Sequence, residues 1–234
     1  MNNKTKWESN IIEKTMHTKD MVVIPCSKPE GFTYKAGQFV QWDVPDKESK
    51  NGIVKRSYSL ASSPHHENLS FCIKIKEDGK AGKYVTRMDK GDTLVFEGPQ
   101  GRFCCNEETD ESLFFIATGA GIAPIIGMIE DQLENKKTDK RIHLLFGLRF
   151  ENDIFWQEKI DHLLSTYNNF SYQITLSRPE GTWDGLKGRV TEHLHEHDGN
   201  HSFYLCGSLP MVKDVREILK EKGVDMKSIH FEIF

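Results

Sequence analysis

The pattern of apolar residues changes near residue 108, and this change constrains the fold more than any other feature of the sequence. The residues before it form short alternating or β-branched apolar segments separated by turn residues, without the periodicity of a long helix. The clearest segments are 21–25, 38–44, 69–75 and 93–96. About six such segments at this spacing predict a small antiparallel β-barrel.

After the acidic stretch 106–111, strand-like segments alternate with helical ones. Residues 113–117 form a continuous apolar run, as expected of a buried parallel strand, and further strands are predicted over 143–148, 172–176 and 202–206. Helices are predicted from about Pro124, over about 153–164, and from Pro210 to a stop at Gly223. The alternation predicts a doubly wound parallel sheet. The expected fold is therefore α+β with two domains, an antiparallel β-barrel over 1–108 and an α/β domain over 109–234.

Composition and charge exclude several classes of protein. The chain of 234 residues has a formal net charge of −4, which argues against nucleic acid as the main partner. No run approaches the roughly 20 apolar residues that span a membrane. The polar segment Met1 to Lys14 is unlike a secretory signal, so we expect a cytoplasmic location.

The cysteine and histidine spacing predicts no metal centre. The five cysteines form no CxxC pair, and only Cys104 and Cys105 are close in sequence, which argues against a four-thiolate iron–sulfur cluster. The ten histidines include no HExxH motif. Any redox cofactor is therefore expected to be held without cysteine ligands.

A glycine-rich turn, Thr118-Gly119-Ala120-Gly121, joins the first predicted parallel strand to the following helix. Ligands of open parallel sheets bind at the carboxyl ends of the strands. The backbone N–H groups of such a turn and the positive end of the helix dipole suit a pyrophosphate. Taken alone, the same glycines are also consistent with a tight strand-to-helix connection.

Several other short motifs occur in the same chain. They are Arg56-Ser57-Tyr58-Ser59, Gly98-Pro99-Gln100-Gly101-Arg102-Phe103, Tyr204-Leu205-Cys206-Gly207 and the terminal Glu232-Ile233-Phe234. Together with the glycine-rich turn and in this order, they resemble the ferredoxin–NADP reductase family in its compact form, without an attached iron–sulfur domain. The resemblance runs from about residue 20 to the end of the chain. It implies that the barrel binds FAD and that the α/β domain binds NADP(H).

The resemblance implies a flavin site on the barrel. Arg56 is suited to a flavin phosphate, Tyr58 offers an aromatic face to the isoalloxazine ring, and Ser59 is expected to donate to the reactive flavin nitrogen. Gly79-Lys80-Ala81-Gly82 resembles the family's phosphate-binding turn, with Gly82 in place of a serine. The expected cofactor-binding residues here are Arg56, Ser57, Tyr58, Ser59, Lys74, Gly79, Ala81, Gly82 and Lys83.

The resemblance also implies residues around the nicotinamide. Cys206 is expected to pack against the nicotinamide and position it for hydride transfer, and Glu232 to relay protons or orient the ring. Phe234 is expected to stack on the flavin and to move aside for the nicotinamide. Ser208 departs from the family, in which proline usually follows the Cys-Gly pair. The expected catalytic residues are Ser59, Cys206, Glu232 and Phe234, and the expected cofactor-binding residues of this domain include Thr118, Gly119, Gly121, Cys206, Gly207 and Phe234.

Three arginines bear on the choice of nicotinamide. Arg149 and the pair Ser177-Arg178 follow predicted strands, and Arg189 follows Gly188. They resemble positions at which bacterial members of the family hold the 2′-phosphate of NADP(H). No acidic residue that would bind a free ribose 2′-OH ends the third strand, so NADP(H) is favoured. A serine–arginine pair also occurs in relatives that use NADH, so NADH stays open.

The expected function is that of a ferredoxin or flavodoxin NADP reductase. Because these carriers are acidic, a basic patch is expected, with Lys74, Lys76, Lys80, Lys83 and Arg87 as candidates. Alternatives are an NAD(P)H:flavin reductase, the reductase component of an oxygenase, or a non-catalytic electron-transfer subunit. A monomer is expected, and the sequence leaves the carrier and the direction of electron flow open.

Overall fold

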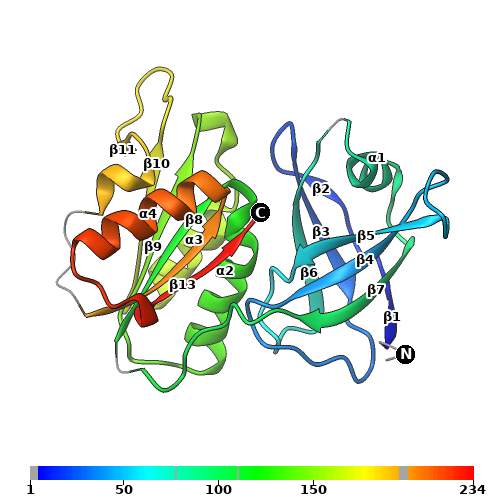
Figure 1. The fold of residues 1–234 in the computed structure, drawn as a ribbon, viewed down its shortest axis with the longest axis horizontal. Coiled ribbons are helices and arrows are strands. Elements are labelled where there is room, and N and C mark those ends of the chain that lie inside the picture. Colours follow the sequence, from blue (N-terminus) through cyan, green and yellow to red (C-terminus); the bar gives the residue numbers. More distant parts are fainter. Residues whose placement is uncertain (1–4, 77, 110, 195–199) are drawn as a thin grey trace.

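A computed structural model of the chain describes residues 5–76, 78–109, 111–194 and 200–234. Two domains lie side by side, an N-terminal one of antiparallel strands and a C-terminal one with a parallel sheet between helices (Figure 1). The expected fold class is therefore confirmed. No helix among the described residues is long and apolar enough to cross a membrane.

The N-terminal domain contains two antiparallel sheets, with strand orders β1-β7-β4-β5 and β2-β3-β6. A bridge between Leu60 and Phe71 joins the β5 side of one sheet to β6 of the other, and a bridge between Ile11 and Cys26 joins β1 to β3. The sheets thus meet at both edges, which closes a barrel. The elements are β1 (Lys6–Asn10), β2 (Thr15–Met16), β3 (Met21–Ser27), β4 (Phe39–Pro45), β5 (Ile53–Ser59), β6 (Asn68–Lys74), α1 (Lys80–Arg87) and β7 (Thr93–Gln100).

The barrel is filled by aromatic side chains from opposing strands. Trp42 of β4 is fully buried and its ring lies 4.9 Å from that of Phe71 in β6, edge to face. Phe96 of β7 packs edge to face on Phe32 at 5.4 Å. Such pairs add about 0.5–1.5 kcal/mol each beyond the burial of their area. The period-2 alternation of these strands therefore directs one face of each strand into a common core.

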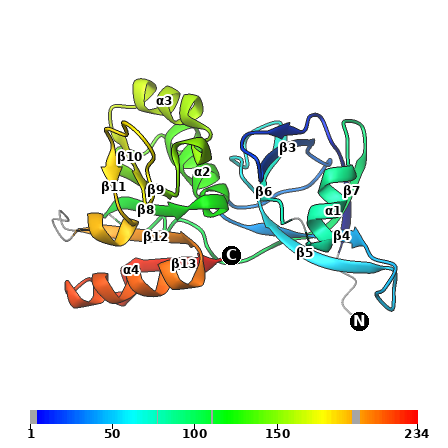
Figure 2. The same ribbon diagram turned by 90° about the horizontal axis from the view of Figure 1, so that it is seen from above.

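The C-terminal domain is a parallel sheet of order β11-β10-β9-β8-β12-β13. Figure 2 shows α2 and α3 on one face of the sheet and α4 on the other. The strands are β8 (Ser112–Thr118), β9 (Ile142–Leu148), β10 (Phe170–Leu176), β11 (Leu186–Lys187), β12 (His201–Gly207) and β13 (Ile229–Ile233). The helices are α2 (Ile122–Glu130), which is continued by a π-helical turn (Asp131–Asn135), α3 (Gln157–Thr166) and α4 (Leu209–Glu221). Short 3-10 turns cover Gly119–Gly121, Glu151–Asp153, Val190–His193 and Met226–Ser228.

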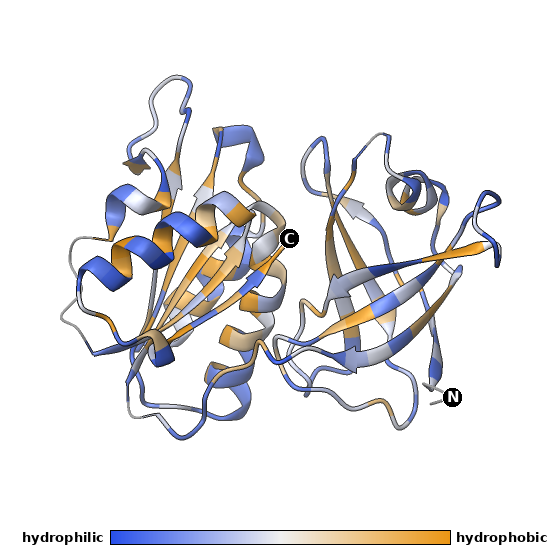
Figure 3. Ribbon diagram, viewed as in Figure 1, coloured by the Kyte–Doolittle hydropathy of each residue, from blue (hydrophilic) through white to orange (hydrophobic). Residues whose placement is uncertain are grey.

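Alternate residues of the central strands supply two separate cores. In β8, Phe115 and Ala117 pack with α2 and α3, whereas Phe114 and Ile116 pack with α4. Both faces of the strand are thus buried, which explains the uninterrupted apolar run in the sequence. The same contrast is visible in Figure 3, where the central strands are hydrophobic and the helices carry hydrophilic residues on their outer sides.

Two features differ from the sequence-based expectation. The helix expected over about 153–164 begins only at Gln157, because Trp156 before it has a left-handed backbone with φ of 60°. The short edge strands β11 and β13 were not predicted. Strand β13 is the more important of the two, because it carries Glu232 and pairs with β12.

Candidate functional site

The two domains meet where the chain ends, beyond the carboxyl end of β13 (Figure 1). Ser59, the last residue of β5, is buried, and its hydroxyl donates to the Glu232 carboxylate (Oγ to Oε2, 3.0 Å). In the parallel register of β12 and β13, Cys206 lies opposite Glu232. The structure therefore brings together three of the four expected catalytic residues. In the sequence, Ser59 and Cys206 are 147 positions apart, and Cys206 and Glu232 are 26 positions apart.

Phe234, the fourth expected catalytic residue, lies at the edge of this cluster. Its backbone N–H donates to the carbonyl of Gly207 (3.0 Å), which anchors the chain end on β12. Its side chain is about half exposed, at 51%. Stacking of Phe234 on a flavin stays a prediction.

One neighbour of the cluster was not predicted as a site residue. A side-chain carbon at Gly101, which follows β7, would lie 3.9 Å from Oε1 of Glu232, and Gly101 has a φ of +99°. Glycine is favoured here by this backbone conformation and by the Phe39 ring, whose atoms would lie 3.0 and 3.1 Å from an added carbon. The signal in the sequence is the turn Gly98-Pro99-Gln100-Gly101, which the family resemblance included without assigning it a contact.

Burial controls the protonation of both ionisable groups in the cluster. It raises the pKa of Glu232 above its usual range, against the hydrogen bond from Ser59, which lowers it. It also raises the pKa of the Cys206 thiol well above its ordinary value, with a further contribution from the charge of Glu232. Cys206 is therefore held as a thiol, which suits packing against a ligand better than nucleophilic attack. Glu232 is suited to holding a proton.

We expect Glu232→Gln to gain stability relative to the wild type as pH rises. Because folding raises the pKa of Glu232, its stabilising contribution is present below its usual pKa of 4.5 and is lost as pH rises through the higher folded pKa. Glutamine has no such dependence. Urea unfolding at a series of pH values measures the difference, with Glu221→Gln on α4 as control. A difference between variant and wild type that is independent of pH would contradict the raised pKa.

The glycine-rich turn and the end of β12 are in direct contact. A side-chain carbon at Gly121 would collide with the carbonyl oxygen of Cys206 and lie 2.8 Å from the backbone nitrogen of Gly207. A carbon at Gly207 would in turn collide with Oγ1 of Thr118. The two motifs thus form one unit at the carboxyl edge of the sheet. Gly119 has a φ of +54° and faces open space, as a phosphate-binding turn requires.

The three expected 2′-phosphate ligands gather at the same edge of the sheet. Arg149 follows β9 and Arg178 follows β10, and the N–H of Arg178 donates to the carbonyl of Arg149 (2.8 Å). Arg189 lies beyond β11, next to Val190, which packs against Gly147 near the end of β9. The three side chains are exposed and make no ion pair within the described part of the chain.

Ser177 is held by the strand next to its own. Its N–H and its hydroxyl both donate to the carbonyl of Leu148 in β9, at 3.0 and 3.3 Å. These bonds hold Ser177, which directly precedes Arg178, beside the end of β9, where Arg149 follows.

On the barrel, the residues expected to hold the flavin lie along β5. Tyr58 is half-buried, and its ring lies 4.5 Å from that of Trp42. Burial raises the pKa of Tyr58 to about 12, and the nearby charge of Arg56 opposes this. Arg56 is exposed on the same side of the strand as Tyr58, whereas Ser57 and Ser59 alternate to the other side.

The Gly79–Gly82 turn begins helix α1, as expected, with Gly79 as the N-cap residue. A side-chain carbon at Gly82 would collide with the carbonyl oxygen of Lys76. A serine at this position therefore does not fit the observed backbone. Ala81 of the turn is half-buried, and Lys83 is exposed.

Two lysines of the expected basic patch are paired with carboxylates. Lys74 lies 3.1 Å from Asp20, and Lys80 bonds Asp46 and Glu48 at 2.7 and 2.9 Å. The hydrogen bond from Lys80 lowers the pKa of Asp46 the most, and the nearby charge of Arg56 lowers it further. Because Lys80 is in α1 and Arg56 is in β5, this carboxylate lies between the two elements. The other candidate cations, Lys76, Lys83 and Arg87, are exposed and make no ion pair with a described residue.

Comparisons with known proteins agree with this arrangement. The sequence matches the oxidoreductase FAD-binding domain over residues 10–104 and the oxidoreductase NAD-binding domain over residues 115–217. It is 32% identical over 214 residues to ferredoxin–NADP reductase B of Sorangium cellulosum, covering 87% of this chain and 86% of that protein. It is 29% identical to the anthranilate 1,2-dioxygenase electron transfer component of Acinetobacter baylyi, covering 95% of this chain and 61% of that protein.

The fold is similar to that of solved structures. A ferredoxin–NADP reductase from Neisseria gonorrhoeae, crystallised with bound FAD and NADP, superposes with a TM-score of 0.83 at 23% identity and covers 97% of this chain and 98% of its own. The Amycolatopsis cytochrome P450 reductase GcoB superposes with a TM-score of 0.88 at 23% identity, covering 99% of this chain and 71% of its own.

Proposed function

Because the chain belongs to the ferredoxin–NADP reductase family, we propose that it transfers hydride between NADPH and FAD, and single electrons between FAD and ferredoxin or flavodoxin. The observation that carries this proposal is the 3.0 Å hydrogen bond from Ser59 to Glu232. It joins the end of a barrel strand to the strand beside Cys206, so that a ligand of each domain would meet at one junction.

The residues of the barrel fit a flavin. Arg56 offers an exposed guanidinium without an ion pair to a described residue, as a phosphate ligand requires. Tyr58 is half-buried and packs at a tilt against the Trp42 ring, as expected of an aromatic side chain that contacts a flavin. Bound FAD supplies the exchange between a two-electron nicotinamide and a one-electron carrier, which protein side chains do not provide.

The proposed roles of the residues follow from their positions. Ser59 orients Glu232 and has a hydroxyl at the end of β5, next to the proposed ring site. Cys206 packs as a neutral thiol beside the nicotinamide, and Glu232 holds a proton at its carboxylate. Phe234 covers the junction until the nicotinamide enters. The Thr118–Gly121 turn binds the dinucleotide pyrophosphate through its backbone N–H groups.

We propose NADP(H) rather than NAD(H) as the nicotinamide. Arg149, Arg178 and Arg189 lie at one edge of the sheet with unpaired side chains among the described residues, where a 2′-phosphate would accept hydrogen bonds from them. We also propose that the domain boundary lies near residue 108, in the connection between β7 and β8. We further propose that the protein is monomeric and cytoplasmic, as expected from its sequence. Gel filtration tests the oligomeric state.

We expect ferredoxin reduction to slow as salt increases, and Arg87→Gln to slow it about threefold at low salt. The unpaired cations near α1 would attract an acidic carrier, and one exposed charge pair contributes roughly 0.2–1 kcal/mol. Stopped-flow or steady-state rates at several ionic strengths measure the effect, with Lys220→Gln on α4 as the control. A rate that is unaffected by both salt and Arg87→Gln would remove α1 from the docking surface.

A second function, as the reductase component of an oxygenase, is favoured by the similarity to the Acinetobacter dioxygenase component. That relative is longer than this chain, which covers 61% of its length. The two functions differ in the accepted carrier, and a flavin reductase would differ from both in releasing its flavin. Purified protein that is yellow and reduces ferredoxin or flavodoxin with NADPH supports the first function. Colourless protein that needs added flavin would contradict it.

A further inference from the structure

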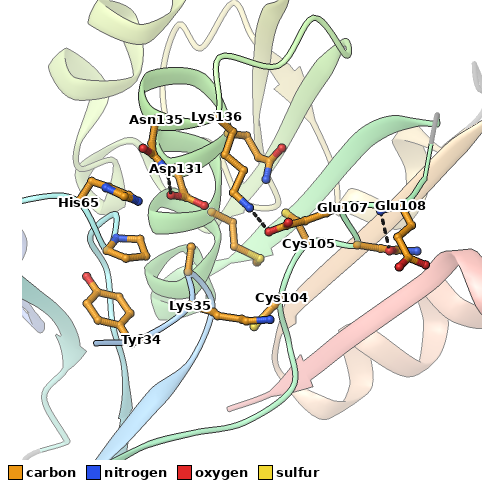
Figure 4. Close-up of a pocket in the computed structure, with 15 residues that line it drawn as sticks. Tyr34, Lys35, His65, Cys104, Cys105, Glu107, Glu108, Asp131, Asn135 and Lys136 are labelled. Carbon is orange, nitrogen blue, oxygen red and sulfur yellow. Dashed lines mark hydrogen bonds and ion pairs between the residues drawn. The ribbon is translucent and has the colours of Figure 1, made fainter. Parts of the chain in front are cut away.

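A cavity of about 400 Å³ lies between the domains, and the proposed electron transfer does not use it. Its volume is within the range of about 300–1,000 Å³ that is typical of small-molecule sites. Three parts of the chain line it: barrel loops, the connection after β7, and the end of α2 with its π-helical turn (Figure 4). It is thus near the carboxyl end of α2, whereas the glycine-rich turn precedes the amino end of that helix.

Cys104 and Cys105, which are adjacent in the sequence, both line the cavity. All five cysteines of the chain are free, and the other three, Cys26, Cys72 and Cys206, are buried. Cys104 and Cys105 are only partly buried as residues, and the thiol of Cys104 is the more accessible of the two. Lys35 also lines the cavity, and its charge acts on the Cys104 thiol (Figure 4).

Two polar side chains of the cavity have no partner among the described residues. Gln132 is 5% exposed as a residue, its side chain makes no hydrogen bond to a described residue, and its amide atoms are not fully shielded from solvent. The Lys35 ammonium makes no ion pair with one. By contrast, Lys136 bonds Glu107, and Asp131 accepts from Asn135 (3.1 Å) and Ser63 (3.4 Å). Both groups are therefore open to hydrogen bonds or ion pairs with a bound polar molecule.

We propose that this cavity is a thiol–disulfide exchange site for a small disulfide that bears carboxylates, of the class of peptide disulfides. Lys35 and Gln132 bind the carboxylate or amide groups, and Cys104 reacts. The Cys104 sulfur, after giving up its proton, attacks one sulfur of the disulfide, whose S–S bond breaks. A mixed disulfide forms at Cys104, and the released thiolate takes up a proton. Cys104 is oxidised, and the leaving half of the disulfide is reduced.

The charges around Cys104 explain why binding matters to this reaction. Burial raises the pKa of the Cys104 thiol, Lys35 and Lys136 lower it, and Glu232 raises it. Because the thiol is held mostly protonated, reaction on random collision is slow. A disulfide bound in the cavity is held at high local concentration, so the rate should saturate as its concentration increases.

Cys105 is not expected to release the adduct. Consecutive Cα atoms are about 3.8 Å apart, whereas disulfides prefer about 4.4–6.8 Å, so a bond between neighbouring cysteines is strained. Burial also raises the pKa of the Cys105 thiol, more strongly than the effect of any nearby charge. The product should therefore be a stable mixed disulfide at Cys104.

The test is incubation of the FAD-loaded protein with oxidised glutathione, followed by intact mass and peptide mapping. We expect one adduct, at Cys104, reversed by a thiol reductant, with a rate that saturates. Cys104→Ser should abolish it and Cys105→Ser should retain it. Lys35→Gln should slow it about threefold at low salt, the effect of one exposed charge. The readout is a mass, so it is independent of activity with NADPH.

The matched probe is bis(2-hydroxyethyl) disulfide, which lacks carboxylates. We expect it to react more slowly, without saturation, and without dependence on Lys35. Equal rates for the two disulfides would overturn the proposal. So would an adduct that persists in Cys104→Ser, or a Cys104–Cys105 disulfide as the only product.

Discussion

Gly121→Ala is expected to lower kcat/KM for NADPH-dependent flavin reduction by about a hundredfold. The added carbon would collide with the Cys206 carbonyl, although the φ of −61° at Gly121 is open to any residue. The collision must therefore push the glycine-rich turn away from the end of β12. A misplacement of about 1 Å at a reacting centre can cost about 10²-fold. Rapid-mixing reduction of the flavin by NADPH measures the effect.

Gly223→Ala is the matched control for this variant. Gly223 lies in the same domain, follows α4 and has no atom within 4 Å of an added carbon, although its φ is +82°. Its replacement adds backbone strain without a collision at the site. We expect it to retain the rate. If Gly121→Ala reduces its flavin as fast as the wild type, the turn and Cys206 are not one functional unit.

Replacing Arg149, Arg178 and Arg189 together with Gln is expected to lower the preference for NADPH over NADH about a thousandfold. Hydrogen bonds to a charged group contribute about 1.5–3 kcal/mol each, and about 1.4 kcal/mol corresponds to a factor of ten. The loss should appear in kcat/KM for NADPH and leave kcat/KM for NADH nearly unchanged, because only NADPH has the 2′-phosphate. The measurement is the ratio of the two values of kcat/KM.

The control for the triple variant is Arg216→Gln. Arg216 lies on α4, with its guanidinium 4.2 Å from the centre of the Phe231 ring, on the other side of the sheet from α2 and α3. It should leave the cofactor ratio unchanged. A wild-type protein that prefers NADH, or a triple variant with an unchanged ratio, would rule out the arginines as the source of NADP(H) specificity.

The fold was largely predictable because its signals are local. The buried run 113–117 and the Thr118–Gly121 turn are contiguous in sequence, and the structure places both as expected. Likewise, the period-2 alternation of apolar residues in each barrel strand indicates which face of that strand lies in the core. The start of α3 was wrong by a few residues, because the left-handed backbone of Trp156 has no signature in an aromatic residue.

The sequence motifs name candidate site residues but do not reveal the contacts between them. The motifs named Ser59, Cys206 and Glu232, but the hydrogen bond between Ser59 and Glu232 joins different domains. It depends on β13, a five-residue edge strand. Its alternation of apolar and polar residues indicates a strand, but not which strand it pairs with. The collision that excludes a serine at Gly82 depends on the path of the chain at Lys76, which the sequence also does not reveal. The positions of Phe234 and of the flavin ligands relative to a bound cofactor stay predictions.

The most direct test of the proposed function is the visible spectrum of the purified protein, recorded without oxygen before and after the addition of NADPH. If the barrel binds FAD and the α/β domain presents NADPH to it, the protein is yellow and the oxidised flavin absorbance disappears on mixing, with about one NADPH consumed per flavin. Oxidised ferredoxin or flavodoxin, added afterwards, restores the absorbance of the oxidised flavin. A protein that neither retains nor binds FAD, or whose bound flavin is not reduced by NADPH, would contradict the proposal.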